Sequence, residues 1–213
     1  MFEVIPGILE KEWSEIERKI ELVKPFAKVI HVDIIDGKFA PNTTFLDPKP
    51  FQKFTPELFF ELHMMVENPI EYLKPFADAG FKRFLGHIEK MEDQEEFVAQ
   101  GQLLGEVGLA IDGPTNIDSV KVPFEDLDCL LLMTIKAGQS GQTFVPEYLK
   151  KTETLRQTQG HLPTLEIDGG INSETIIQAK NAGATRFVAT NYIFKGHDPK
   201  AQFDFLQRLN KEC

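Results

Sequence analysis

The sequence predicts a single (β/α)8 barrel, and three observations lead to this fold class. Apolar runs of strand length alternate with segments of helical spacing along the whole chain. Eight such strand and helix units fit into 213 residues, a length near the compact end of the range for this barrel. The run at 128–135 is apolar at nearly every position, as in parallel strands that helices cover on both faces.

The expected elements follow one another in regular order. Apolar runs predict strands at 2–5, 27–37, 58–66, 82–88, 106–111, 128–135, 164–167 and 186–194, and Pro6-Gly7 is expected to end the first of them. Apolar residues three and four apart predict helices at 12–23, 69–79, 94–104, 146–157 and 173–182, and a last helix starting near 198–199. Short helices are expected around Phe51 and over 116–120. A doubly wound open sheet is the alternative, but its Gly-x-Gly-x-x-Gly fingerprint is absent after the first strand.

The composition indicates one soluble, cytoplasmic domain over residues 1–213. No linker or shift in composition marks a boundary, and 42% of the residues are hydrophobic, which is enough for a sizeable core. No apolar stretch approaches the roughly 20 residues of a membrane span. The first residues lack the basic start and long apolar segment of a secretory signal.

Net charge and cysteine content argue against further classes of protein. The formal net charge of −10 argues against a general nucleic-acid or anionic-membrane surface. Small anions stay open as ligands, because backbone N–H groups can bind them. The two cysteines, Cys129 and Cys213, cannot form a disulfide framework, and Cys129 is expected to be a small core residue.

The segment 27–37 carries ionisable side chains inside an apolar run. Alternation along a strand places His31, Asp33 and Ile35 on one face, so the imidazole and the carboxylate converge. Such a pair can bind one divalent ion, which offsets the cost of burying a carboxylate. A hydrogen-bonded His–Asp pair at a strand end is the alternative, and this short motif alone does not decide between them.

Partners for this pair are expected from other strands. His63 lies near the end of the strand at 58–66, and Asp168 follows the strand at 164–167. In a barrel the C-terminal strand ends form one ring, so these side chains can meet His31 and Asp33. Two imidazoles and two carboxylates suit Zn²⁺, Fe²⁺, Mn²⁺ or Co²⁺. Taken singly, His63 reads as a hydrogen-bonded core histidine, and Asp-Gly-Gly as an ordinary turn.

Two glycine pairs suggest contacts with a substrate. Gly169-Gly170 follows a strand and allows a phosphate to approach bare N–H groups, in the region where barrels of this type usually bind phosphate. The loop Gly138-Gln-Ser-Gly141 has the composition of a closing flap, or equally of a plain glycine turn.

Together these motifs resemble ribulose-phosphate 3-epimerases over nearly the whole chain. The matching segments are His-Val-Asp-Ile-Ile-Asp-Gly at 31–37 with Phe39 and Pro41-Asn42, Glu-Leu-His-Met-Met-Val at 61–66, His87-Ile-Glu89, Met133-Thr134, Gly138 with Gly141-Gln142 and Phe144, Asp168-Gly-Gly-Ile171, and Ile193-Phe194. The combination is far more specific than any one piece. The resemblance implies an isomerase of carbohydrate metabolism that acts on a small sugar phosphate.

The resemblance also implies residue roles. A divalent ion, Zn, Fe, Mn or Co, is expected on His31, Asp33, His63 and Asp168. Asp33 and Asp168 are further expected to act as acid and base: one removes the C3 proton beside the ketone, the metal holds the enediolate, and the other returns a proton from the far side.

Further residues are assigned to the substrate by the same resemblance. Met65 and Met133 match apolar residues that line the intermediate, and Ile35 stands where a third methionine is usual. The expected substrate and phosphate contacts are Gly138, Gly141, Gln142, Gly169, Gly170, Thr190 and Asn191.

The chain departs from the family pattern around the substrate. Gly7 replaces a serine after the first strand, and Lys38 replaces a histidine. Thr190-Asn191 stands in place of Gly-Ser, Lys136-Ala137 in place of Asn-Pro or a similar pair, and Gln139-Ser140 in place of Phe-Gly. These changes predict a shifted phosphate or a different preferred ketose phosphate, with Lys136 as an added positive charge.

The leading hypothesis is therefore a C3 epimerase for ribulose 5-phosphate and xylulose 5-phosphate. An epimerase for another ketose phosphate, such as allulose 6-phosphate, is the nearest alternative, and a non-catalytic barrel that binds metal or phosphate is a different class. Related decarboxylase barrels carry Asp-x-Lys-x-x-Asp, whereas Asp33 is followed by Ile35 at the lysine position. The sequence leaves a homo-oligomer open.

Overall fold

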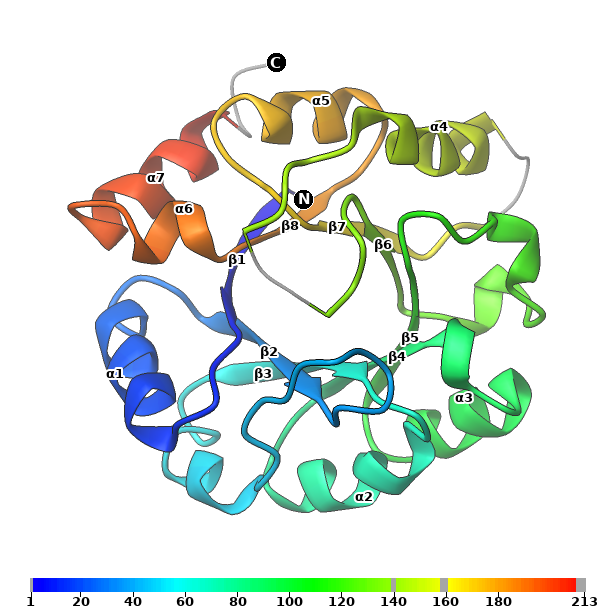
Figure 1. The fold of residues 1–213 in the computed structure, drawn as a ribbon, viewed down its shortest axis with the longest axis horizontal. Coiled ribbons are helices and arrows are strands. Elements are labelled where there is room, and N and C mark those ends of the chain that lie inside the picture. Colours follow the sequence, from blue (N-terminus) through cyan, green and yellow to red (C-terminus); the bar gives the residue numbers. More distant parts are fainter. Residues whose placement is uncertain (1, 139–140, 158–160, 210–213) are drawn as a thin grey trace.

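The computed structural model describes residues 2–138, 141–157 and 161–209, and this part of the chain forms the predicted barrel. Its parallel strands close in the order β1 to β8, each paired with the next, and β8 pairs with β1 (Figure 1). The strands are β1 (Glu3–Ile8), β2 (Val29–Ile35), β3 (Phe59–Met65), β4 (Arg83–His87), β5 (Glu106–Ile111), β6 (Cys129–Met133), β7 (Thr164–Asp168) and β8 (Arg186–Ala189).

Helices lie around the barrel as an outer ring (Figure 1). The α-helices are α1 (Trp13–Val23), α2 (Ile70–Asp78), α3 (Gln94–Gln102), α4 (Lys150–Gln157), α5 (Thr175–Asn181), α6 (Asn191–Phe194) and α7 (Pro199–Leu209). Short 3₁₀ helices are η1 (Lys49–Lys53), η2 (Ile88–Lys90), η3 (Ile117–Ser119), η4 (Phe124–Asp126) and η5 (Pro146–Leu149). Within the described residues, no helix combines the length and apolar character needed to cross a membrane.

Helix α1 illustrates why these segments become helices. Its residues Ile16, Ile20 and Val23 are spaced by four and three positions, so they form one face, and all three are buried. The same spacing principle buries Leu73 and Phe76 of α2. The helices therefore cover the outer face of the barrel with the apolar stripes that the sequence predicts.

Alternation along the strands divides the apolar residues into two cores. The larger core lies between strands and helices and includes Ile30, Val32 and Ile34 of β2. The smaller one lies inside the barrel and includes Ile35, Met65 and Met133. The predicted alternation in β2 is thus confirmed, because its odd-numbered residues face the interior and its even-numbered residues face the helices.

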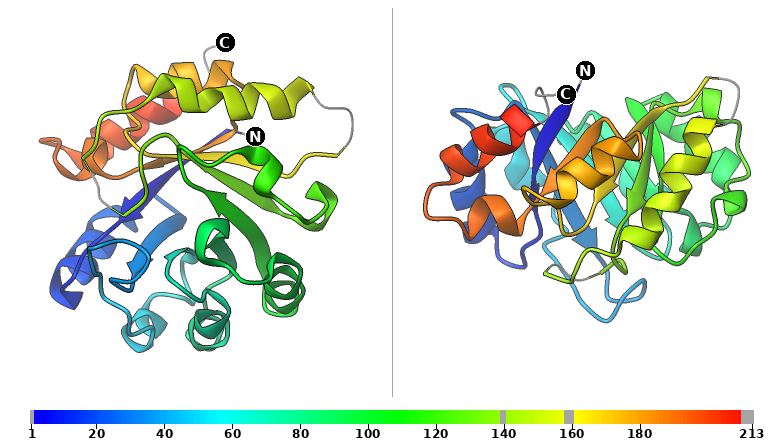
Figure 2. Two further views of the ribbon diagram at one scale, coloured as in Figure 1. Left: turned by 45° about the vertical axis from the view of Figure 1, so that its right-hand side comes forward. Right: turned by 90° about the horizontal axis from the view of Figure 1, so that it is seen from above.

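The strand register brings ionisable residues to one level. Asp33 of β2 pairs in register with His63 of β3, and Met133 of β6 pairs with Asp168 of β7. The loops after β2 and after β6 project from the same end of the barrel (Figure 2). They touch each other there, since the side-chain amide of Asn42 donates to the carbonyl of Gly138 over 3.4 Å. This end is the C-terminal mouth of the barrel.

The first strand is longer than predicted, because Pro6 and Gly7 lie inside β1. The ladder from β1 to β2 pairs only Gly7 and Ile8, so it begins just after the proline, which cannot donate a hydrogen bond. The fixed φ of proline is also compatible with extended backbone. The expectation that Pro6-Gly7 ends the strand was therefore wrong.

The last strand is shorter than predicted. It ends at Ala189, and α6 (Asn191–Phe194) occupies the end of the expected strand at 186–194. The backbone N–H of Phe194 donates to the carbonyl of Thr190, which closes one helical turn. Ile193 is fully buried in that turn, so its apolar character reflects helix packing and not a strand.

Candidate functional site

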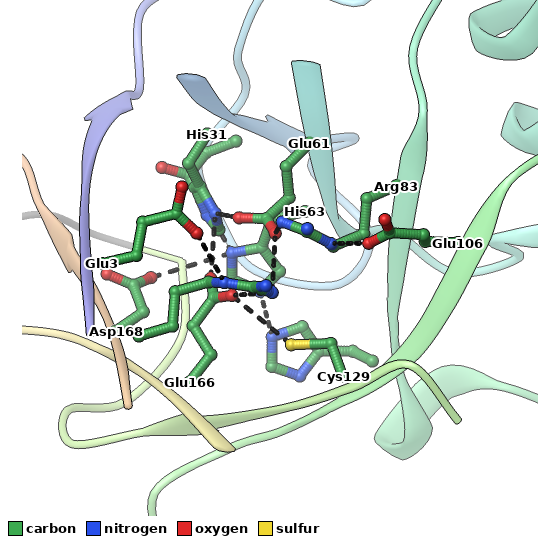
Figure 3. Close-up of polar contacts among 12 residues, drawn as sticks. Glu3, His31, Glu61, His63, Arg83, Glu106, Cys129, Glu166 and Asp168 are labelled. Atoms are coloured by element: carbon green, nitrogen blue, oxygen red, sulfur yellow. Dashed lines mark hydrogen bonds and ion pairs between the residues drawn. The ribbon is translucent and has the colours of Figure 1, made fainter. Parts of the chain in front are cut away.

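Four ionisable side chains meet at the mouth of the barrel. His31 and Asp33 come from β2, His63 from β3 and Asp168 from β7, and one ligand atom from each lies within 4.8 Å of the others. Figure 3 shows His31, His63 and Asp168 converging inside the barrel. The structure thus brings together the complete set that the sequence predicts.

The two imidazoles approach the same carboxylate. His63 Nδ1 lies 2.8 Å from Asp33 Oδ1, and His31 Nε2 lies 3.2 Å from the same oxygen. His63 Nδ1 is also 3.7 Å from Asp168 Oδ2. Both rings are fully buried, whereas 13% of the Asp168 side chain is exposed. The carboxylates therefore lie nearer the opening than the rings.

The two carboxylates differ in protonation behaviour. Burial raises the pKa of Asp33, but the charges and hydrogen bonds of His31 and His63 outweigh it and hold that pKa well below its usual range. Burial and the charge of Asp33 together raise the pKa of Asp168 to about 6. Paired carboxylates with pKa values so far apart are suited to opposite roles in proton transfer.

A layer of buried charges lies below the site, on the side away from the mouth. Nδ1 of His31 lies 2.6 Å from Oε1 of Glu61, and Arg83 donates to the other oxygen of Glu61 over 2.6 Å. Arg186 donates to Glu166 over 3.3 Å. Figure 3 shows Glu61 beside His31, with Arg83 reaching Glu61 from the far side. Burial raises the pKa of Glu61, but His31 and Arg83 outweigh it and hold that pKa well below its usual range. Burial and the charge of Glu61 raise the pKa of Glu166.

Most of this charged layer could not be assigned from sequence. Alternation indicates that Glu61 shares a face with His63, but Arg83 and Arg186 read as ordinary polar residues at strand starts. Cys129 is buried as expected, and its thiol lies 3.4 Å from Glu166 Oε2. The signal that could have found the layer is the combination of inward parity with charge, because each of these residues is two positions from another inward-facing residue.

A cavity of about 520 Å³ opens at the mouth beside the carboxylates. Among the predicted site residues its lining includes Asp33, Asp168, Met65, Met133, Gly138, Gly141, Gln142, Gly169, Gly170, Thr190 and Asn191. Ile35 does not line it but packs into the interior core beneath.

Lys136 is exposed and lies outside the lining, so the structure does not support its role as an added charge at the substrate. Residues 139–140 of the expected flap lie outside the described residues.

Two glycines shape the wall of the cavity after β7. Gly169 has a φ of +114° and Gly170 a φ of +69°, and L-residues with side chains rarely adopt either value. A Cβ on Gly170 would lie 2.9 Å from Cβ of Phe144. The hydroxyl of Thr134 donates to the carbonyl of Gly169 over 2.5 Å and fixes the turn. Both glycines therefore bring bare backbone to the wall of the cavity.

Two departures from the family pattern lie next to each other. A Cβ added to Gly7 would overlap the hydroxyl of Thr190 and lie 2.8 Å from Cγ1 of Val188. Thr190 lines the cavity, and its side chain occupies the space beside Gly7. The loss of a side chain at residue 7 and the gain of one at residue 190 are thus sterically linked.

Fold and site together define a class of protein. It is a (β/α)8-barrel enzyme with two carboxylates and two imidazoles around one cavity at the C-terminal mouth. Comparison with solved structures agrees on the fold: 3-hexulose-6-phosphate synthase from Salmonella typhimurium has a TM-score of 0.73 at 12% identity, over 99% of both chains. At that identity the likeness shows the fold alone.

Sequence comparison identifies the family. The model of the ribulose-phosphate 3-epimerase family matches residues 3–194. Ribulose-phosphate 3-epimerase of Schizosaccharomyces pombe is 34% identical over 206 residues, covering 92% of this chain and 89% of that protein. The cytoplasmic isoform of Oryza sativa subsp. japonica is 32% identical over 204 residues, covering 92% and 89%. The chain belongs to the ribulose-phosphate 3-epimerase family and is an epimerase, an enzyme of the isomerase class.

Proposed function

We propose that the protein is a metal-dependent C3 epimerase that interconverts D-ribulose 5-phosphate and D-xylulose 5-phosphate. The observation that carries this proposal is the placement of Asp33 and Asp168. Both line the cavity at the mouth, and they reach it from β2 and β7, which are not neighbours in the barrel. A substrate carbon between them can lose a proton to one carboxylate and regain a proton from the other.

The donor set fits a divalent ion. His31 presents Nε2 to Asp33 while its Nδ1 is held by Glu61, so only one ring nitrogen is left for the site. His63 presents Nδ1 to Asp33 and Asp168. Burial lowers the pKa of His31, but the surrounding carboxylates outweigh it and raise that pKa well above its ordinary value. The site therefore attracts positive charge, and we propose Zn, Fe, Mn or Co on His31, Asp33, His63 and Asp168.

The residues of the chain then divide the proton transfer between them. A divalent ion, when bound, stabilises the negative charge that develops on the substrate oxygens. The ionised carboxylate of Asp33 accepts the proton from C3, beside the ketone, in one direction of the reaction. Asp168, which lines the other side of the cavity, delivers a proton to the opposite face of that carbon. Met65 and Met133 line the cavity next to them and shield the reacting carbon from water.

The phosphate group is proposed to bind along the wall formed by the loops after β6, β7 and β8. Gly141, Gly170 and Asn191 all line that wall, and the two glycines have positive φ. Backbone N–H groups of such glycine turns form concave anion sites. The side-chain amide of Asn191 adds a neutral donor there. Gly138, Gln142, Gly169 and Thr190 complete the proposed substrate contacts.

The arrangement of Gly7 and Thr190 is the reason for proposing a second candidate substrate. Thr190 adds a methyl and a hydroxyl to the cavity wall, next to a position that has no side chain. This rearrangement favours a shifted phosphate, or a longer substrate such as allulose 6-phosphate. The ratio of kcat/KM for the two sugar phosphates, in wild type and in Thr190→Gly, measures the preference.

The reaction itself is tested by proton NMR of ribulose 5-phosphate in D₂O. The wild type should introduce deuterium at C3 and produce xylulose 5-phosphate. Asp168→Asn should abolish net epimerisation, because one face of C3 then lacks its proton donor. Asp128→Asn is the matched control, since Asp128 accepts from the backbone N–H of Val107 and lies outside the cavity. Wild-type turnover by Asp168→Asn would refute the two-carboxylate mechanism.

The setting proposed for this enzyme is the cytoplasm, with a small sugar phosphate as its partner and without nucleic acid or membrane. The rice relative is named a cytoplasmic isoform. The strong excess of acidic residues, with a formal net charge of −10, agrees with a protein that does not bind polyanions. Fractionation of cells that express the tagged protein would test the compartment.

A further inference from the structure

Behind the proposed metal site, His63 belongs to a chain of hydrogen bonds that leads away from the substrate cavity and from the other proposed ligands. Nε2 of His63 lies 2.8 Å from Nε2 of His87, at the end of β4. Nδ1 of His87 lies 2.8 Å from Oε2 of Glu89, in η2. Neither His87 nor Glu89 lines the cavity, so they do not contact a substrate there. Their contacts lead instead to His63.

Glu89 is firmly held at the end of this chain. Its Oε1 accepts the backbone N–H of Asp112 over 2.7 Å, and the side chain of Thr115 contributes a further hydrogen bond. Burial raises the pKa of Glu89, but the hydrogen bond and charge of His87 outweigh it and lower that pKa to about 2. Glu89 is therefore an ionised carboxylate, which can only accept hydrogen bonds.

The position of each proton follows from this acceptor. Because Glu89 accepts, Nδ1 of His87 carries a proton. The two Nε2 atoms lie 2.8 Å apart, so one of them donates and the other accepts, and a neutral His87 that carries its proton at Nδ1 can only accept at Nε2. Nε2 of His63 must then carry the proton shared between the two rings. This leaves Nδ1 of His63, which faces Asp33 and Asp168, as the nitrogen available to a metal ion.

We propose that His87 and Glu89 are positioning residues that fix the tautomer of His63, so that its Nδ1 presents a lone pair to the metal ion. The inference rests on the metal site of the proposed function. Ligating histidines generally depend on such partners at their second nitrogen. Here the partner is another neutral ring, whose own tautomer a carboxylate sets. Phe39 packs on His87 with ring centroids 4.8 Å apart, and His87 is fully buried.

The sharpest variant is Glu89→Gln, which keeps size and changes only the hydrogen-bonding pattern. If the glutamine NH₂ faces His87, the shared protons shift along the relay and Nδ1 of His63 becomes protonated. The opposite orientation, with the glutamine oxygen facing His87, would set the NH₂ against the N–H of Asp112, so that two donors face each other. The first orientation is therefore the one expected. Affinity for Co²⁺ or Zn²⁺, measured by competition with a chromophoric chelator, should fall about 10–100-fold. Asp128→Asn is the control for loss of a carboxylate elsewhere and should keep wild-type affinity.

A second pair of variants keeps the proposal testable if Glu89→Gln does not fold. His87→Gln can place an amide oxygen where Nε2 of His87 stood, so it still accepts from His63. His87→Leu cannot accept. His87→Gln should therefore bind metal more tightly than His87→Leu, by about tenfold or more. Equal affinities for these two variants would contradict the relay.

The tautomers can also be observed directly. Two-bond ¹H–¹⁵N spectra of the zinc-loaded wild type should show His87 protonated at Nδ1 and His63 protonated at Nε2. Observation of His87 protonated at Nε2 would overturn the proposal, as would wild-type metal affinity in a folded Glu89→Gln variant. A wild type that binds no divalent ion would instead refute the metal site of the proposed function, and the relay with it.

Discussion

His31 connects two environments through its two ring nitrogens. Nε2 faces Asp33 and the cavity, whereas Nδ1 faces Glu61 in the charged layer below. Arg83 in turn bridges Glu61 and Glu106, with distances of 2.6 Å and 2.7 Å. The orientation of a proposed ligand thus depends on side chains that never contact a substrate.

Arg83 should consequently be among the most sensitive residues of the barrel. Arg83→Met would remove the arginine closest to the buried carboxylate of Glu61 and leave its Oε2 with only Arg186 at 4.0 Å, so we expect the free energy of unfolding to fall by about 3–5 kcal/mol. Urea unfolding followed by circular dichroism measures this loss. Arg18→Met is the control, because the pair of Arg18 with Glu15 is exposed, and it should cost at most about 1 kcal/mol. Equal losses in both variants would contradict the buried-charge account.

Gly7 and Thr190 should behave as a coupled pair. Gly7→Ser forces its new Cβ against Thr190 and Val188, both stiff at χ1, so the expected cost is about 1–3 kcal/mol of stability. Thr190→Gly removes one of these neighbours and should recover part of the loss in the double variant. Urea unfolding of both single variants and the double variant gives the coupling energy. Additive effects would show that the two positions are independent.

At the scale of single residues, the sequence predicts the residues that line the cavity better than the residues that position them from behind. Asp33, Asp168, Met65 and Met133 follow from strand parity together with the family resemblance, and all four line the cavity. The resemblance also includes His87 but does not indicate what it contacts. Its role depends on a 2.8 Å contact between different strands, which no pattern within one strand contains. Lys136 was assigned from its charge and its place at the end of the sixth strand, and it is exposed and outside the cavity lining.

Among the elements, the loop between β7 and α5 contains two cavity-lining residues, Gly169 and Gly170, whose positive φ values favour glycine. Gly170→Ala would place a methyl at a φ of +69° and within 3.0 Å of Phe144. We expect the KM for the sugar phosphate to rise about tenfold, corresponding to about 1.4 kcal/mol, while kcat changes less. Steady-state kinetics over a range of substrate concentrations separates the two constants.

A matched control exists at another glycine with positive φ. Gly183 lies at the C-terminal end of α5 with a φ of +105° and is outside the cavity lining. Gly183→Ala should reduce stability through backbone strain and contact with Arg156, but it should leave KM unchanged. An unchanged KM in Gly170→Ala would remove this turn from the proposed phosphate site.

The elements also show where prediction from sequence ends. The strands and most helices lie within a few residues of their predicted positions, because apolar periodicity is strong in a barrel buried on both sides. The errors fall on β1 and β8. Pro6 reads as a strand end, but pairing with β8 keeps it inside β1. The segment after Ala189 is apolar enough for a strand, and tertiary packing of Ile193 makes it a helical turn instead.

For the molecule as a whole, metal binding should stabilise the fold. An ion that binds only the folded state adds about 2.7 kcal/mol at 100 times its Kd, so Tm should rise when Zn²⁺ or Co²⁺ is added to chelator-treated protein. His31→Gln should reduce that rise, and Asp128→Asn should not. Scanning calorimetry makes the measurement. A Tm that is the same with and without the ion would contradict the proposed site.

Acid should destabilise the barrel in a defined range of pH. The pKa of Glu89 is lowered to about 2, and its ordinary value is 4.5, so its contribution is complete above about pH 4.5. That contribution is lost as the pH falls towards 2, because the unfolded state then binds the proton first. Urea unfolding of metal-free protein between pH 5 and pH 2.5 should show a flatter dependence for Glu89→Gln than for wild type. Parallel curves would exclude Glu89 from acid unfolding.

The charged layer of Glu61, Arg83, Glu166 and Arg186 has a kinetic consequence. Glu61 and Glu166 are fully buried, and the side chains of Arg83 and Arg186 are 6% and 13% exposed, so this layer occupies the barrel interior below the site. The cavity beside Asp33 and Asp168 opens at the mouth, above the layer. Under the proposed reaction, both epimers occupy this same cavity between Asp33 and Asp168 and cannot be bound together. Each sugar phosphate is then a strictly competitive inhibitor of the reaction of the other. The rate of net conversion in either direction therefore depends on release of the product from this cavity as well as on the proton transfers within it.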